Sequence, residues 1–583
     1  MSDASSFLRD TRRRLAEHWL ATPGDELPRQ VGGDLGRLQR LLMNSAMRFE
    51  ALEALEDELA RSLAQRARDP RDAAAVLAAM LYWRAHRLDA GAIDLARAPA
   101  WLVKDLVAWL IAPVPFFTER GESARFAKHL SSVIERIHRV AAAETNGALW
   151  TSAALLVASR LDCTPAYAND ENLIDLQRHR GALLDWVARK SGAQLDHTFG
   201  PRAAGKKMRV GVIARHLRPS AEAFATLPLY EHLKENDVDV VLYVCEPPPA
   251  NHPLGQYCAG RVSAAKVLPP DLPTRRKVIL SDDLDVLFYG TNLSTASHDL
   301  VFLAQHRLAR VQVTGVANVV TTGLANIDYF LSGTSSDPAA DAQAHYTERL
   351  FRMEGCAHCF SYGPPAGPSP RTLTRKDLGV GDDQVLFVSG ANLYKITPEL
   401  LDAWRKILDA SPKTILLLFP FGPNWYASYP VEAFDRYAKS VLGEERVRVL
   451  NPQPPPDRAQ LREIFRVADV YLDSFPFAGS TSLIEPLEAE LPVVTRGGST
   501  FRAAMGAAML RELGVDELTA PDAESYVTLA TELARDANRR REISRRIRDR
   551  MLSRPSRPSF LDSAGYALRI AAAFRAMLAE SRA

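Results

Sequence analysis

The sequence predicts an α/β protein in which an all-helical N-terminal domain precedes two doubly wound, Rossmann-like halves. Before residue 195, apolar residues recur at helical spacing, as in Leu52, Leu55, Leu59 and Leu63. After residue 205, short β-branched runs alternate with helical segments in two successive series. Between the series, residues 361–379 are rich in proline and glycine, which suits an interdomain hinge.

Length and composition are those of an ordinary globular protein of several domains. The 583 residues exceed what one core holds and suggest roughly three to four domains. With 47% hydrophobic and 24% charged residues, the chain is not of the disordered class. Because 72 basic and 70 acidic residues nearly cancel, there is no global attraction to nucleic acid or to a membrane.

The sequence also predicts a cytoplasmic protein that neither inserts in a membrane nor holds a metal. No signal-peptide core and no run of 18 apolar residues occurs. Five irregularly spaced cysteines fit a reducing compartment. Cys356 and Cys359 have the spacing of half a zinc site, but no second pair follows at a matching distance. The basic stretch 539–560 keeps an apolar stripe, Ile543 and Ile547, and predicts a solvated helix rather than a nucleic-acid patch.

We expect the helical domain to span residues 1–200, the N-terminal half 205–365 and the C-terminal half 366–583. The helical domain lacks a period of about 34 residues and is therefore a compact bundle rather than a repeat array. The expected strands are 208–214, 238–245, 284–290, 309–315 and 327–333, and then 383–390, 413–422, 445–452, 469–477 and 491–498. Apolar strands separated by helices predict parallel sheets, and two such halves facing each other form one cleft.

The loop after the strand at 469–477 predicts a phosphate site, because ligands of such sheets lie beyond the carboxyl ends of the strands. Gly479 allows a tight turn before Ser480, Thr481 and Ser482, which lead into a helix. Ser482 and Glu485 have the spacing of a capping box. A carboxylate repels phosphate but accepts hydrogen bonds from a ribose diol, so Glu485 favours a nucleotide. The alternative is a capping box with no ligand.

A second loop predicts a diphosphate contact. Lys395 precedes a helix with Thr397 as its N-cap and Pro398 as its first residue. A lysine at such a corner can stabilise charge that develops on a leaving group, although it can also be an ordinary surface lysine.

The N-terminal half is expected to supply the acceptor side of the cleft. After its first strand, His216, Arg218, Glu222 and Thr226 are the polar candidates, and His216 or Glu222 could act as a general base. Further along, the loop 321–323 has two threonine hydroxyls that could contact a sugar or a peptide.

The blocks "LARVQVTGVANVVTTGLANIDYFLS", "NLYKITPELLDAWRKIL" and "ADVYLDSFPFAGSTSLIEPLEAELPVVTRGG" occur in this order along the chain. Together they resemble glycosyltransferase family 41, and the resemblance covers residues from about 205 to 550. The helical domain without repeats and the "LGVDEL" motif are similar to the soluble bacterial branch that modifies adhesins, which is related to the protein O-GlcNAc transferases. This resemblance implies a GT-B fold and metal-independent, inverting transfer of a hexose, typically glucose from UDP-glucose, to asparagine of a protein such as an adhesin. It implies no cofactor besides the UDP-sugar donor.

The resemblance also assigns residues. Lys395 matches the family lysine at the UDP diphosphate, and Asn392 lies where the O-GlcNAc branch has a nucleotide-contacting glutamine. Ser480, Thr481 and Ser482 fall on the phosphate loop, and Glu485 takes the place of the aspartate that holds the ribose. Three departures concern the acceptor end: Ala221 stands at a family histidine, Thr481-Ser482 replaces Asn-Gly, and "NPQPPP" at 451–456 replaces a His-Pro-His feature.

Three functions are therefore open. The first is transfer of a hexose, glucose in particular, to asparagine of a protein. The second is O-GlcNAc-type transfer to serine or threonine, motivated by the hydroxyl-rich loop. The third is a non-catalytic scaffold that binds a UDP-sugar, motivated by the missing histidine. The helical domain would dock the acceptor or buttress the N-terminal half.

Overall fold

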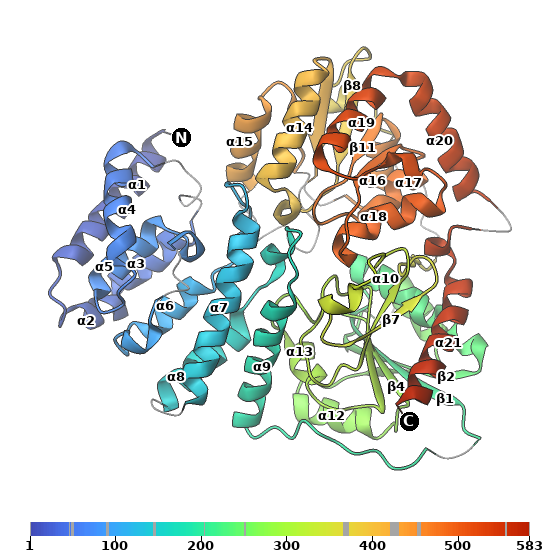
Figure 1. Cartoon of the computed structure of the whole chain (residues 1–583), viewed down its shortest axis with the longest axis horizontal. Helices are drawn as coiled ribbons and strands as arrows, with labels where there is room; N and C mark the ends of the chain where they lie inside the picture. Colours follow the sequence, from blue (N-terminus) through green and yellow to red (C-terminus); the bar gives the residue numbers. More distant parts are fainter. Residues whose placement is uncertain are drawn as a thin grey trace.

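The computed structural model describes residues 2–45, 47, 52–88, 93–143, 147–202, 205–249, 252–364, 372–419, 431–451, 456–553 and 557–581. In Figure 1 a helical domain lies beside two α/β halves, one above the other. Each half has one parallel sheet with helices around it. The predicted fold class is therefore confirmed.

The described residues of the N-terminal domain form helices that are joined by turns and irregular segments. Its helices are α1 (Ser2–Ala21), α2 (Leu27–Gly32), α3 (Asp34–Met43), α4 (Ala54–Arg66), α5 (Ala73–Tyr82), α6 (Val103–Leu110), α7 (Glu122–Ala142), α8 (Gly147–Arg160) and α9 (Ile174–Lys190). α5 is apolar on nearly every side and forms the centre of the first helices, whereas α7 buries one apolar stripe against α8 and α9. A short 3-10 turn, η5 (Thr164–Tyr167), connects α8 to α9.

The N-terminal half has a seven-stranded parallel sheet in the order β3-β2-β1-β4-β5-β6-β7. Its strands are β1 (Met208–His216), β2 (Val238–Glu246), β3 (Ala264–Val267), β4 (Val286–Tyr289), β5 (Val311–Thr314), β6 (Tyr329–Gly333) and β7 (Arg349–Met353). The helices of this half are α10 (Ala221–Glu231), α11 (Pro253–Gly260), α12 (Leu272–Leu280) and α13 (Asp299–Ala304). β4, β5 and β6 are buried along their whole length, as expected of strands covered on both faces.

The C-terminal half has a six-stranded parallel sheet in the order β10-β9-β8-β11-β12-β13. Its strands are β8 (Val385–Ser389), β9 (Thr414–Leu418), β10 (Val447–Val449), β11 (Val470–Leu472), β12 (Val493–Arg496) and β13 (Thr519–Ala520). Its helices are α14 (Pro398–Ala410), α15 (Val431–Leu442), α16 (Arg458–Arg466), α17 (Ile484–Glu488), α18 (Phe501–Glu512), α19 (Ala523–Arg535) and α20 (Ala537–Met551). α20 buries Ile543 and Ile547, so the predicted apolar stripe of this basic helix is confirmed.

The last helix, α21 (Ser563–Glu580), returns to the N-terminal half. Its apolar residues, among them Tyr566, Ile570 and Phe574, belong to the same core as the strands of the first sheet. The Tyr329 hydroxyl also donates to Glu580 at 2.9 Å. Residues 366–583 thus contain the second sheet and, at their end, a helix of the first core.

Several details differ from the sequence prediction. β3, β7 and β13 were not predicted, because they are short or partly exposed and lack a continuous apolar run. The prediction that a strand reaches residue 477 was wrong, because β11 ends at Leu472 and an irregular segment follows. Part of the expected hinge and residues 452–455 of the "NPQPPP" motif lie outside the described residues.

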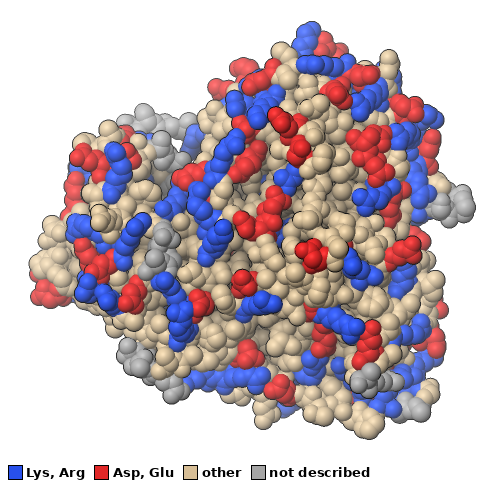
Figure 2. Space-filling view, viewed as in Figure 1, with Lys and Arg blue, Asp and Glu red and all other residues tan. Residues whose placement is uncertain are grey.

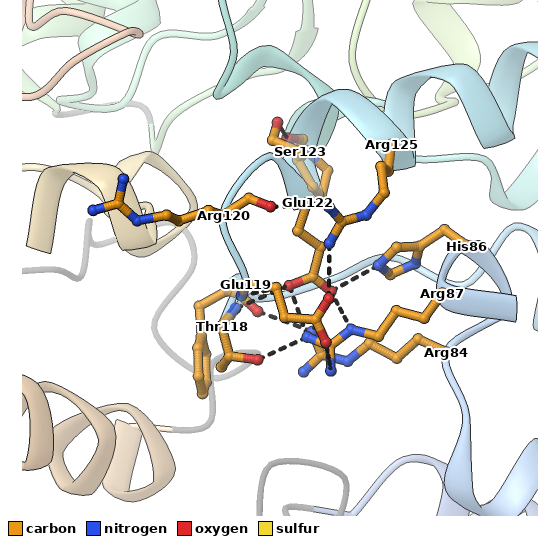
Figure 3. A network of polar contacts seen from close by, with 11 residues as sticks. Arg84, His86, Arg87, Thr118, Glu119, Arg120, Glu122, Ser123 and Arg125 are labelled. Atoms are coloured by element: carbon orange, nitrogen blue, oxygen red, sulfur yellow. Dashed lines mark hydrogen bonds and ion pairs between the residues drawn. The ribbon is translucent and has the colours of Figure 1, made fainter. Parts of the chain in front are cut away.

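A buried carboxylate organises the start of α7 (Figure 3). Glu122 accepts hydrogen bonds from His86 at 2.8 Å and from two nitrogens of Arg87 at 2.7 Å each. It also accepts from the backbone N–H groups of Thr118 and Glu119, at 2.9 and 3.2 Å. This network fixes the loop 116–121.

That loop contacts the C-terminal half. Phe116 stacks on Tyr437 of α15. The Gly121 N–H donates to Glu399 at 2.6 Å, and Arg120 pairs with Asp402 at 2.5 Å. Glu399 and Asp402 lie in the first turns of α14, so the helical domain holds the helix that follows Lys395.

The visible surface carries both charge signs. In Figure 2 basic and acidic side chains are interspersed over all three parts of the molecule on this face. Within the described ranges, no helix is long and apolar enough to cross a membrane.

Candidate functional site

A cavity of about 800 Å³ lies between the two α/β halves. Residues from all three parts of the molecule line it. The N-terminal half contributes, among others, Arg215, His216, Arg218, Glu222, Thr291, Asn292 and His298; the C-terminal half contributes Asn392, Tyr394, Lys395, Phe477, Ser480, Thr481, Ser482 and Met505; the helical domain contributes Thr164 and Tyr167. The predicted cleft is therefore present, and it receives the loops after β1, β4, β8 and β11.

Lys395 lies in a 3-10 turn, η9 (Leu393–Lys395), that follows β8. Its side chain is only 8% exposed, and its ammonium donates to the Ala478 carbonyl at 2.8 Å and sits 3.8 Å from the Phe477 ring centre. Burial lowers the pKa of Lys395 to about 8, against the opposing effect of Asp473. As predicted, Thr397 caps α14 and Pro398 is its first residue.

Asp473 shapes the loop that follows β11. One carboxylate oxygen accepts from the Ser474 and Gly479 N–H groups at 2.8 and 2.7 Å, and the other accepts from the Thr495 hydroxyl at 2.8 Å. Burial raises the pKa of Asp473 to about 6. A Cβ on Gly479 would lie 2.7 Å from that carboxylate and 2.8 Å from the Ser482 hydroxyl, so glycine is required here for space. Sequence patterns gave no role to Asp473, since its partners are set by the fold.

Ser480, Thr481 and Ser482 line the cavity, and their contact with a phosphate stays a prediction. They precede a 3-10 turn, η11 (Thr481–Leu483), and the five-residue helix α17. The predicted capping box of Ser482 and Glu485 was wrong. α17 begins after Leu483 without a side-chain cap, because the 3-10 turn occupies the positions that a capping serine needs.

Glu485 lies behind this loop and not among the residues that line the cavity. Its Oε1 accepts from Arg458 at 2.7 Å, and Arg458 also pairs with Glu488 at 2.6 Å. The Arg458 guanidinium covers the ring of Tyr362. Burial raises the pKa of Glu485, and the arginine opposes this shift. Contact of Glu485 with a ribose stays a prediction.

His216 and Glu222 both line the cavity on the side of the N-terminal half. His216 ends β1, and burial lowers its pKa. Glu222 lies in the first turn of α10, where it accepts from the Thr291 hydroxyl at 3.0 Å and from the Asn292 N–H at 3.2 Å. Burial raises the pKa of Glu222. The raised pKa of Glu222 moves this carboxyl toward the range in which proton transfer is effective, whereas the lowered pKa of His216 favours its neutral form, which can accept a proton.

Other candidates of the N-terminal half have structural contacts. The Thr226 hydroxyl donates to the carbonyls of Glu222 and Gly290. Thr321 and Thr322 donate to the buried carboxylate of Glu348, and neither lines the cavity, so the prediction that these two hydroxyls contact a ligand gains no support. Arg218 lines the cavity and pairs with Glu246 at 2.8 Å.

Thr164, Tyr167 and His298 line the site but were not predicted. The first two come from the helical domain, more than 200 residues before Lys395 in the chain, and no local pattern marks them. His298 precedes α13 and has no motif around it.

The C-terminal half is similar to a known family. Residues 367–567 match the model of glycosyl transferase family 41. The resemblance inferred from the sequence is thereby supported at the level of the family, and no finding separates the adhesin-modifying branch from the others.

Curated relatives and a solved structure agree with this match. The chain is 32% identical over 304 residues to the "Probable UDP-N-acetylglucosamine--peptide N-acetylglucosaminyltransferase SPINDLY" of Petunia hybrida, which covers 52% of this chain and 31% of that protein. It is 34% identical over 180 residues to the Caenorhabditis elegans UDP-N-acetylglucosamine--peptide N-acetylglucosaminyltransferase, covering 29% of this chain and 14% of the relative. The matches span less than a third of the length of these relatives. A mutant O-GlcNAc transferase from Thermobaculum terrenum has the same fold, with a TM-score of 0.58, 22% identity, and coverage of 91% of this chain and 99% of that one.

Proposed function

We propose that this protein transfers a sugar from a UDP-sugar to a protein acceptor. One observation carries the proposal: a single cavity brings Lys395 and the hydroxyls of residues 480–482 from one half together with His216 and Glu222 from the other. A buried ammonium and hydroxyls suit a diphosphate, and titratable groups across the cavity suit the activation of an acceptor.

The proposed reaction is a direct, inverting displacement. The acceptor atom forms a bond to the anomeric carbon while the bond from that carbon to the β-phosphate oxygen breaks, and UDP leaves with the electron pair. Lys395 would stabilise the charge that develops on UDP, since its ammonium is held in place by one carbonyl and one ring. Glu222 or His216 would take the proton of the acceptor. Charge stabilisation by lysine and hydroxyls requires no metal.

Two pairs of sugar and acceptor are candidates. The names of the relatives favour N-acetylglucosamine as the sugar and a peptide as the acceptor, and the hydroxyl-rich loop agrees with that donor. Transfer of a hexose to asparagine is the second candidate, because the helical domain without repeats resembles the adhesin-modifying branch.

A mass assay tests the function. The purified chain is incubated with a peptide library and either UDP-N-acetylglucosamine or UDP-glucose, and intact masses and fragment spectra are recorded. We expect one N-acetylhexosamine or one hexose to be added, and fragmentation to report serine, threonine or asparagine as the site.

Lys395→Ala should lower turnover by about a hundredfold. Lys413→Ala, which removes an exposed lysine paired with Asp383, should leave turnover unchanged. If the chain binds UDP but transfers no sugar from either donor, the proposed transferase function is wrong and the non-catalytic scaffold is favoured.

A further inference from the structure

The segment 161–171 of the helical domain bridges the two α/β halves. On one side, the Cys163 N–H donates to the Thr295 carbonyl at 3.3 Å, and the Tyr167 hydroxyl donates to the Ser294 carbonyl. On the other side, the buried Arg502 of α18 donates to the carbonyls of Tyr167, Asn169 and Glu171. The segment is thus fixed to both walls of the cavity.

The turn η5 lies beside the turn that carries Lys395. η5 contacts η9 directly, and the Tyr167 and Phe477 rings are 6.3 Å apart. Phe477 is the ring beneath the Lys395 ammonium. Thr164 begins η5 and lines the same cavity.

The Thr164 side chain has a hydroxyl that the protein itself does not use. Thr164 is 4% exposed, and its Oγ1 has no hydrogen-bond partner among the described residues. Its backbone N–H is already satisfied by Asp162 at 2.8 Å. A buried hydroxyl without a partner is costly, and proteins keep few of them. A valine of the same shape would avoid that cost, so a hydroxyl at this position indicates a ligand.

We propose that the Thr164 hydroxyl binds a hydroxyl of the sugar in the UDP-sugar donor, which makes the helical domain part of the donor site. This inference rests on the proposed function. The diphosphate would lie at Lys395 and residues 480–482, and the acceptor at His216 and Glu222. The transferred sugar must lie between them, where η5 joins the two walls. A neutral hydroxyl can both donate and accept, which suits a sugar hydroxyl.

Calorimetry with UDP and with the two UDP-sugars tests this assignment in the full chain. Thr164→Val removes the hydroxyl and keeps the shape. We expect its affinity for UDP to match the wild type within about twofold, and its affinity for the preferred UDP-sugar to fall about tenfold, as for one lost hydrogen bond. Thr164→Ser should restore the affinity for the UDP-sugar. Thr151→Val, on the exposed side of α8, is the matched control and should bind both ligands as the wild type does.

The outcomes separate this inference from the proposed function. If Thr164→Val binds the UDP-sugar as the wild type does, or loses UDP and UDP-sugar affinity equally, the assignment to the sugar is wrong while the proposed function stands. If the wild type binds neither UDP nor a UDP-sugar, both are wrong. The thermal unfolding of each variant is also measured. It shows whether a loss of affinity comes from a change at the binding site or from a destabilised fold.

Discussion

Lys395 is a buried cation whose charge depends on pH near neutrality. Burial lowers its pKa to about 8, so its ammonium is present below that pH and is lost as the pH rises through it. Of the two forms of Lys395, only the charged ammonium, and not the neutral amine, can stabilise negative charge on a diphosphate. We therefore expect kcat/KM for the donor, which reports the free enzyme, to be level below about pH 8 and to fall about tenfold for each further pH unit.

Lys395→Arg is the control for this pH profile. Because arginine stays charged throughout the range, the decline above pH 8 should disappear even if the rate at neutral pH is reduced. Initial rates measured about one unit on either side of pH 8 suffice for the comparison. If kcat/KM of the wild type does not change with pH over that range, Lys395 does not supply the positive charge at the diphosphate.

The sequence predicts cavity residues well where a local pattern exists. Lys395 and residues 480–482 follow strands and precede helical turns, and all of them line the cavity. The pairing of Glu485 with Arg458 could not be predicted, because the two residues are 27 positions apart and no motif joins them. The same reason applies to Thr164, which reaches the site only through the docking of a separate domain.

Among the elements, strand prediction succeeded for the inner strands and failed for three of the four edge strands, which are β3, β7 and β13. β4 and β5 are continuous apolar runs, which is how they were recognised. β3 lies at the edge of the first sheet and is at most half-buried along its length, so its sequence has no apolar run. The prediction of a capping box at the start of α17 was wrong for a different reason, because a 3-10 turn occupies the position of the expected cap.

The start of α7 depends on the Glu122 carboxylate. Burial alone would raise the pKa of Glu122, but the hydrogen bonds from His86 and Arg87 hold it well below its usual range. A carboxyl with a lowered pKa contributes stability above its unfolded pKa and loses that contribution as the pH falls. We expect Glu122→Gln to lower the Tm by several degrees at neutral pH, since it leaves buried cations without their carboxylate.

The difference between wild type and Glu122→Gln should shrink as the pH falls below about 4, where an unfolded glutamate is protonated. Glu135→Gln is the control, because Glu135 lies on the same helix and pairs with Arg139 in an exposed position. Its Tm should stay within about a degree of the wild type. Equal Tm values for Glu122→Gln and wild type at neutral pH would show that the network does not fix α7.

At the scale of the whole molecule, two predicted halves formed the expected cleft, but the position of the helical domain could not be foreseen. The alternation of strands and helices predicts each sheet, and the rule for doubly wound sheets places the site between them. The contacts of the helical domain are made by single residues such as Arg120 and Arg502, which follow no periodic pattern. The structure shows this domain in contact with both halves.

Arg502 connects the C-terminal half to the helical domain. It is 2% exposed and donates to three backbone carbonyls of the bridging segment. Arg502→Ala would leave the carbonyls of the buried residues Tyr167 and Asn169 without this partner, which is unfavourable by about 1–3 kcal/mol for each group. We expect faster amide hydrogen exchange in residues 162–171 and a several-fold higher KM for the UDP-sugar, because the turn that holds Thr164 would no longer be fixed to α18.

Arg511→Ala is the control, since Arg511 is an exposed residue of the same helix that pairs with Asp516. It should change neither quantity. Faster exchange in Arg502→Ala with an unchanged KM would mean that the bridge supports the fold and not the donor site, whereas unchanged exchange would show that other contacts hold the segment in place.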